Sequence, residues 1–157
     1  MKKSPATYVA QGALIAALYV ILTEISAVFG LSGGAIQLRL SEALTILPLY
    51  LPSAIPGLFI GCIVSNLLTG CALWDIVFGS LATLVAAIVT SRLKRVKYLA
   101  SIPPIVANTL VIPPIIAYVY GTEMALWLIY ITVFLGELVS CGLLGTMLIG
   151  IIEKKRK

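Results

Sequence analysis

The residue with the clearest chemical potential is Glu137, a carboxylic acid inside a long apolar run. Holding a carboxylate near the middle of a membrane costs roughly 2.5–3.5 kcal/mol, so such residues usually have a function. On the same predicted helical face, at three- and four-residue spacing, lie Trp127, Tyr130 and Phe134. Aromatic rings beside a carboxylate suit a flat heteroaromatic base that stacks and donates hydrogen bonds. We therefore expect Glu137, Tyr130 and Phe134 to contact a ligand; the alternative is a structural bond from Glu137 to another helix, through Asn108.

A second polar group precedes the second apolar run and consists of Gln37, Arg39 and Glu42. We interpret this stretch as an outer loop that enters a short helix and covers the site. Arg39 is expected to pair with Glu42 or with Asp75, and so to hold the loop in place. Gln37 either faces the ligand or makes a simple hydrogen bond within the loop.

Four further residues are candidates for ligand contact. Asp75 opens a predicted helix, where a carboxylate also caps N–H groups and favours the helix dipole. Trp74 precedes it at the outer interface. Asn66 and Asn108 either contact the ligand or join neighbouring helices by hydrogen bonds.

The composition argues against the common enzyme classes. The 157 residues are 61% hydrophobic with a mean hydropathy of +1.11, which is far too apolar for a soluble domain. There is no histidine for zinc or Ser-His chemistry, and no Gly-x-x-x-x-Gly-Lys-Ser/Thr loop for ATP phosphates. Cys62, Cys71 and Cys141 have no framework spacing and are interpreted as packing residues. We predict no enzymatic activity, no catalytic residues, no cofactor and no metal.

The basic residues predict a membrane topology. Apart from Arg39, they form three clusters that flank apolar runs, at residues 2–3, 92–97 and 154–157. Such clusters lie on the cytoplasmic side of a membrane, so the net charge of +5 does not indicate nucleic acid. We predict a multi-pass protein of the bacterial cell membrane with both termini in the cytoplasm.

Charge parity also divides the apolar run 42–68, which Pro48, Pro52 and Pro56 interrupt. The first two basic clusters lie on the same side of the membrane only if the chain crosses it an even number of times between them. The runs 8–29 and 75–91 give two crossings, so the run 42–68 must contribute two more, as a hairpin turning near Pro52 and Ser53. The prediction is an all-α integral membrane protein, a single domain over residues 1–157 with six transmembrane helices and a short second helix. The predicted helices span residues 8–29, 40–51, 54–68, 75–91, 99–120 and 124–152. The outer half then holds five acids and one base, which favours a neutral, donor-rich or cationic ligand.

Two pairs of small residues suggest close helix contacts. Ala13-x-x-x-Ala17 forms a smooth stripe on the first helix, and Gly57-x-x-x-Gly61 forms another on the third. Internal packing is the interpretation for the glycine pair. For the alanine pair, internal packing and a partner helix both remain open.

Three segments together closely resemble the QueT family: AIQLRLSEALTILPLYLPSAIPGLFIGC, LWDIVFGSLATLVAA and LGELVSCGLLG. The members are substrate-binding S components of energy-coupling-factor (ECF) transporters. The resemblance implies the ECF S-component fold, a queuosine precursor (a 7-deazaguanine base) as substrate, and an Ala-x-x-x-Ala motif on the first helix. It also implies a transmembrane coupling protein and two cytosolic ATPases as partners.

We therefore predict a membrane-embedded binding subunit that captures a deazapurine from outside for ATP-driven import, with Ala13 and Ala17 contacting a partner. The alternative is a self-sufficient secondary carrier for a small neutral or cationic heterocycle, acting as a homodimer. In that case Glu24 or Glu137 would carry a proton.

Overall fold

A computed structural model describes residues 4–31 and 38–156, in which every regular element is a helix. Six helical segments follow one another along the chain. They are α1 (Pro5–Val28); the 3₁₀-helix η1 (Leu40–Leu49); α2 (Ala54–Leu68); the π-helix η2 (Asp75–Gly79) running into α3 (Ser80–Arg92); η3 (Lys97–Ser101) running into α4 (Ile102–Val119); and α5 (Leu126–Glu137) continuing through the π-helix η4 (Leu138–Leu144) into α6 (Gly145–Arg156).

Four of these segments are long and apolar enough to cross a membrane, and they are Pro5–Val28, Asp75–Arg92, Lys97–Val119 and Leu126–Arg156. The other two, η1 and α2, are shorter apolar helices. The ten residues of η1 reach about 20 Å at the roughly 2.0 Å rise of a 3₁₀-helix. Pro48 lies inside η1 and has no N–H to donate to the preceding turn, which is consistent with its departure from α-helical geometry.

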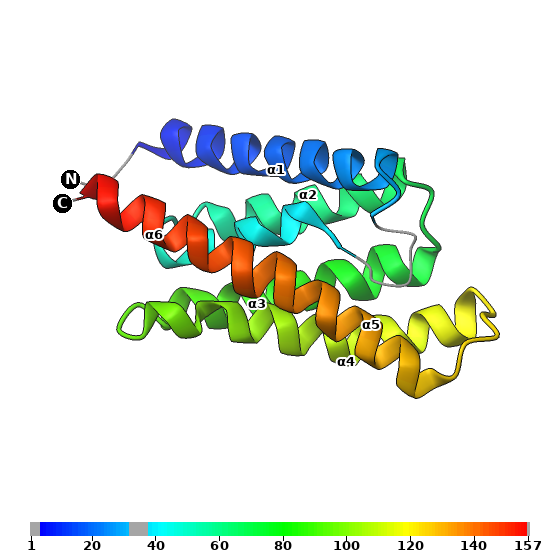
Figure 1. Ribbon diagram of the computed structural model, residues 1–157. Helices are drawn as coiled ribbons and strands as arrows, with labels where there is room; N and C mark the ends of the chain where they lie inside the picture. The colour runs from blue at the N-terminus through cyan, green and yellow to red at the C-terminus, as the bar shows by residue number, and fades with distance from the viewer. Residues whose placement is uncertain (1–3, 32–37, 157) are drawn as a thin grey trace.

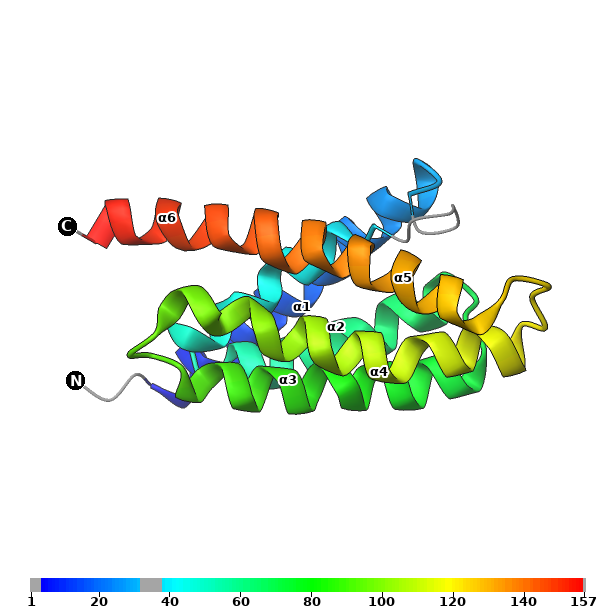
Figure 2. The same cartoon turned by 60° about the horizontal axis from the view of Figure 1, so that its bottom comes forward.

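Successive helical segments run in opposite directions, so the connections between them lie alternately at one end of the molecule and at the other (Figures 1 and 2). One end holds the start of α1, the η1–α2 turn, the α3–α4 connection and the end of α6. The hydroxyl of Tyr8 donates to the carbonyl of Pro52 at 3.4 Å, which joins α1 to that turn. The described basic residues of clusters 92–97 and 154–156 lie at this same end.

Glycines bring α1 and α2 close together, side by side along the molecule (Figure 1). A Cβ added to Gly57 would lie 2.7 Å from the backbone oxygen of Gly12. A Cβ added to Gly61 would lie 2.9 Å from the Cβ of Tyr19. Neither position has room for a side chain, so the interpretation of the glycine pair as internal packing is confirmed.

The short helix η1 lies in the interior, where it contacts α1, α3, η4 and α6. Seven of its ten residues are buried, including Glu42, Thr45 and Ile46. Irregular backbone at membrane depth is tolerated where surrounding protein shields it from lipid. The helices around η1 supply that shield, and they hold Glu42 at the centre of the bundle.

Candidate functional site

Both π-helical segments begin at or beside an acidic residue. Asp75 is the first residue of η2, and Glu137 directly precedes η4. Single π-helical turns inside longer helices occur frequently at functional sites, because they widen the helix and change which residues face inward. The surroundings of Asp75 and Glu137 are therefore candidate functional sites.

Glu137 is 6% exposed, and both of its carboxylate oxygens accept hydrogen bonds from other buried groups. The Nδ2 of Asn108 on α4 donates to Oε1 at 2.9 Å. The thiol of Cys141 donates to Oε2 at 3.2 Å. The structural bond between Glu137 and Asn108 is thus present, and it joins the helix containing α5 to α4.

Glu42 lies beside this pair and is 1% exposed. The hydroxyl of Tyr19 on α1 donates to Glu42 Oε1 at 2.5 Å. The other oxygen, Oε2, is buried and has no hydrogen-bond partner among the described residues. One carboxylate oxygen each from Glu42 and Glu137 and the sulfur of Cys141 all lie within 4.8 Å of one another. We refer to Glu42, Glu137, Asn108, Cys141 and Tyr19 together as the polar centre.

The oxygens and the sulfur of the polar centre have the spacing of a metal site, the one such grouping found within residues 4–31 and 38–156. The thiol donates its one hydrogen to Glu137, and its sulfur also lies 3.5 Å from the backbone oxygen of Glu42. The hydroxyl of Thr45 lies 3.6 Å from the same sulfur. These contacts are those of a protonated thiol inside a hydrogen-bond network.

A small cavity of about 10 Å³ adjoins the polar centre. Its walls combine three polar side chains, Arg39, Asn108 and Glu137, with the apolar side chains of Ile112 and Val133. This volume is about what one water molecule needs. Pockets that bind small organic ligands measure roughly 300–1,000 Å³, so the walls must separate before a ring system can enter.

Arg39 faces this cavity, but it does not form the ion pair predicted from the sequence. The ion pair present among the described residues joins Lys97 to Glu153 at 2.9 Å. The carboxylates of Glu42 and Asp75 are instead bonded to the hydroxyls of Tyr19 and Tyr120. Among the described residues, no carboxylate therefore forms an ion pair with the Arg39 guanidinium, which lies near the polar centre.

Asp75 belongs to a separate polar group, which lies at the end of the bundle opposite the basic clusters 92–97 and 154–156. The hydroxyl of Tyr120 donates to Asp75 Oδ2 at 2.5 Å and accepts from the backbone N–H of Ala72 at 2.9 Å. The Nδ2 of Asn66 donates to the backbone oxygen of Asp75 at 3.3 Å. Burial, followed by the bond to Asp75, raises the pKa of the Tyr120 hydroxyl well above its ordinary value. These bonds join α2, η2 and the end of α4.

The aromatic candidates lie mostly at the surface. Trp74 is 56% exposed and stacks on Phe78 with ring centroids 5.6 Å apart. Trp127 and Phe134 are also exposed, and Tyr130 is half-buried. The buried side of α5 consists instead of Ile129, Val133, Gly136 and Glu137. None of the four aromatic residues lines the cavity, and their contact with a ligand stays a prediction; Gln37 lies outside the described residues.

Two hydrogen bonds to the acidic residues were not anticipated from the sequence, and both come from tyrosines. Tyr19 and Tyr120 each donate to one of the acidic side chains. A buried tyrosine generally finds a partner for its hydroxyl, so a tyrosine in the middle of an apolar helix is the signal that indicates Tyr19.

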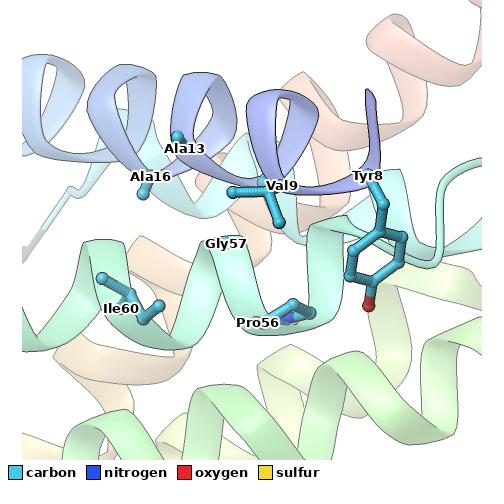
Figure 3. Close-up of a pocket in the computed structure, with 8 residues that line it drawn as sticks. Tyr8, Val9, Ala13, Ala16, Pro56, Gly57 and Ile60 are labelled. Atoms are coloured by element: carbon cyan, nitrogen blue, oxygen red, sulfur yellow. The ribbon is translucent and has the colours of Figure 1, made fainter. Parts of the chain in front are cut away.

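An apolar groove runs along the outside of α1 and α2 and has a volume of about 410 Å³. Figure 3 shows Val9 and Ala16 of α1 facing Pro56 and Ile60 of α2 across it, and Ala13 also belongs to its lining. The remaining residues of its lining are Tyr8, Gly12 and Gly57. The side chains of Ala13 and Ala17 are exposed, so the alanine stripe lies at the surface of the molecule.

Comparison with known proteins gives a family match along nearly the whole chain. The family model described as QueT transporter matches residues 9–154. A protein of Lactococcus lactis subsp. cremoris (strain MG1363), named Queuosine precursor transporter QueT, is 41% identical over 86 residues. That region covers 54% of this chain and 50% of the relative, so the match spans half of the relative's length. No solved structure matches the chain.

Proposed function

Because this chain belongs to the QueT transporter family, we propose that it binds a queuosine precursor, a 7-deazaguanine base, for uptake into the cell. With four helices able to span the bilayer, it is a multi-pass membrane protein. The observation that carries the proposal is the buried cavity between Arg39, Asn108 and Glu137.

The chemistry of this cavity suits a guanine-like edge. Such a base offers a ring N–H and an amino group as donors, and a carboxylate such as Glu137 accepts both. Its carbonyl oxygen is an acceptor, which the Arg39 guanidinium or the Asn108 amide can satisfy. Ile112 and Val133 supply apolar surface for the faces of the ring. In this proposal the walls of the cavity move apart on binding, and the base replaces the direct bond between Asn108 and Glu137.

The test is equilibrium binding of a 7-deazaguanine base to the purified protein and to Glu137→Gln. A charge-assisted hydrogen bond lost from a buried site costs about 1.5–3 kcal/mol, so we expect affinity to fall about 10- to 100-fold. Glu123→Gln is the matched control, because Glu123 is exposed in the α4–α5 connection and should leave affinity unchanged. Equal affinity of wild type and Glu137→Gln would remove Glu137 from the proposed site.

We further propose six crossings with both termini in the cytoplasm, and transport as the S component of an ECF importer. The described basic residues of 92–97 and 154–156 lie at one end of the bundle, which supports the orientation. The exposed stripe of Ala13 and Ala17 beside the groove supports contact with the transmembrane coupling protein, because small residues let helices approach closely in lipid. Two cytosolic ATPases would then supply the energy.

This partner surface is tested by co-purification with the coupling protein. Ala13→Trp fills an exposed position, so we expect it to prevent assembly while leaving binding of the base unchanged. Met147→Trp on α6 is the matched control, since Met147 is 58% exposed and lies outside the groove. Normal recovery of Ala13→Trp in the complex would exclude the stripe as the contact.

The secondary-carrier alternative makes a different prediction for isolated vesicles. A self-sufficient carrier would take up the base under a proton gradient with no ATPase present. An S component would bind the base in such vesicles but would not accumulate it.

A further inference from the structure

The end of the molecule that holds the α3–α4 connection and the end of α6, which we call the basic end, carries a large excess of positive charge (Figure 1). Residues 92–97 contain four basic side chains and residues 154–156 contain three, whereas Glu153 is the one acid in these two stretches and their immediate neighbours. Glu153 is paired with Lys97, whose Nζ lies 2.9 Å from its Oε1. No other ion pair forms within the described part of the chain, so the remaining cations of the basic end have no carboxylate partner.

A pocket of about 400 Å³ opens on the α3–α4 connection. Arg95 and Lys97 line it, together with three less polar side chains, those of Val96, Tyr98 and Leu99. The connection is tied to α3, because the hydroxyl of the buried Thr90 donates to the carbonyl of Ala100 at 3.2 Å. Since Lys97 is paired with Glu153, the guanidinium of Arg95 is the cation of this pocket that lacks an ion pair among the described residues.

An apolar groove of about 410 Å³ lies between α3 and α4, which run side by side (Figure 2). Its walls include the exposed side chains of Val85 and Val89 on α3 and of Ile102 and Val106 on α4. Both helices belong to segments that are long and apolar enough to span a membrane, so the groove faces the hydrocarbon of a bilayer. Val89 precedes Arg92 by three residues, which places the end of the groove within about one helical turn, ~5.4 Å, of the basic connection.

We propose that this face of the protein binds an anionic phospholipid, with the phosphate at Arg95 and one acyl chain in the groove between α3 and α4. A guanidinium binds phosphate oxygens through two parallel hydrogen bonds, and basic pockets at the ends of membrane helices suit anionic head groups. Tyr98 is 71% exposed, and its amphipathic ring is of the kind enriched at the level of the head groups. A zwitterionic lipid would bring a second cation to an end of the molecule that already has an excess of them.

The experiment titrates the purified full chain in detergent with dioleoyl-phosphatidylglycerol and with dioleoyl-phosphatidylcholine, and counts bound lipids by native mass spectrometry. The two probes have the same chains, so their difference isolates the head group. One basic residue beside an anionic lipid contributes about a fivefold change in affinity, so we expect wild type to bind phosphatidylglycerol at least about fivefold more tightly. Arg95→Gln should lose about that factor for phosphatidylglycerol and keep its affinity for phosphatidylcholine.

Lys155→Gln is the matched control for charge, because it removes one exposed cation from the same end of the molecule but outside the pocket. Its affinity for phosphatidylglycerol should stay within about twofold of wild type, since the proposed contact is local. Equal losses in Arg95→Gln and Lys155→Gln would overturn the pocket as the site. Equal affinity of wild type for the two lipids would overturn the preference for an anion.

The groove is tested by filling it. Val106→Trp is expected to lower affinity for both lipids about threefold or more, because the acyl chain loses its packing surface. Leu110→Trp is the control, since Leu110 is 63% exposed on the same helix and does not line the groove. Helical circular dichroism checks both variants, and Val89→Trp on the opposite wall replaces Val106→Trp if the latter does not fold. Equal affinities in the filled variant and in Leu110→Trp would overturn the groove as the place of the chain.

A competition measurement separates a lipid from a soluble phosphate compound. Glycerol 3-phosphate has the phosphate but no chains, so we expect it not to displace phosphatidylglycerol at equal concentration. Displacement would show that the phosphate alone is recognised, and it would overturn the assignment to a phospholipid.

Discussion

Removing the hydroxyl of Tyr19 tests whether the polar centre holds the bundle together. Tyr19 is 1% exposed, and its hydroxyl donates to Glu42 at 2.5 Å from a different helix. Interhelical hydrogen bonds in membranes contribute about 0.6 kcal/mol on average and at most about 1.7 kcal/mol, and bonds to charged groups are the stronger ones. The short, buried bond to a carboxylate belongs at the upper end. We therefore expect Tyr19→Phe to lower the free energy of unfolding by about 1.5 kcal/mol.

The assay is reversible unfolding in mixed detergent micelles, followed by loss of helical circular dichroism. Tyr118→Phe is the matched control; Tyr118 is 82% exposed, so its change should stay within about 0.5 kcal/mol. A double-mutant cycle with Glu42→Leu isolates the pair, and we expect a coupling energy of about 1 kcal/mol or more. A coupling energy below about 0.5 kcal/mol would refute the reasoning that this bond joins α1 to η1.

Two further predictions concern helix packing and the outer tyrosine. Gly57→Ala should lower the free energy of unfolding by about 1–3 kcal/mol, because its Cβ would meet the backbone oxygen of Gly12 at 2.7 Å. Gly150→Ala, with nothing within 4 Å of the added atom, should not, and similar losses in both would contradict the packing. The pKa of Tyr120 is raised in the folded state, so the unfolded chain ionises first and stability should fall as pH rises above about 10. Unfolding measured from pH 8 to 11 should show a smaller fall in Tyr120→Phe, and identical profiles would exclude the partly buried bond to Asp75 as the cause.

The sequence alone indicates Glu137 as a candidate, because the cost of a carboxylate inside an apolar run can be recognised from its neighbours in the chain. Glu137 lies in an apolar run, where a carboxylate is costly, and the sequence predicts either ligand contact or a bond to Asn108. The structure contains the Asn108 bond. Six helical segments also follow from apolar runs and breakers, without reference to tertiary contacts.

The partners of the other polar residues depend on how the helices are rotated against one another. The prediction pairs Arg39 with Glu42 or Asp75, but in the structure these carboxylates accept hydrogen bonds from the hydroxyls of Tyr19 and Tyr120. Such choices are decided by contacts between segments far apart in the chain. The same applies to the aromatic face of α5. Three- and four-residue spacing places these residues on neighbouring positions of one α-helix, but packing decides which of them face inward: Ile129 and Val133 are buried with Glu137, whereas Trp127 and Phe134 are exposed.

The small cavity beside the polar centre has a kinetic and energetic consequence. Under the proposed function, a cavity of about 10 Å³ admits the base only in a more open form of the bundle, and binding shifts the population toward that form. The apparent dissociation constant then equals the intrinsic one divided by the open fraction, so a fraction of about one in a hundred weakens the measured affinity about a hundredfold. Substitutions far from the base that favour the open form would accordingly tighten binding without touching the ligand, and the association rate would level off at the rate of opening.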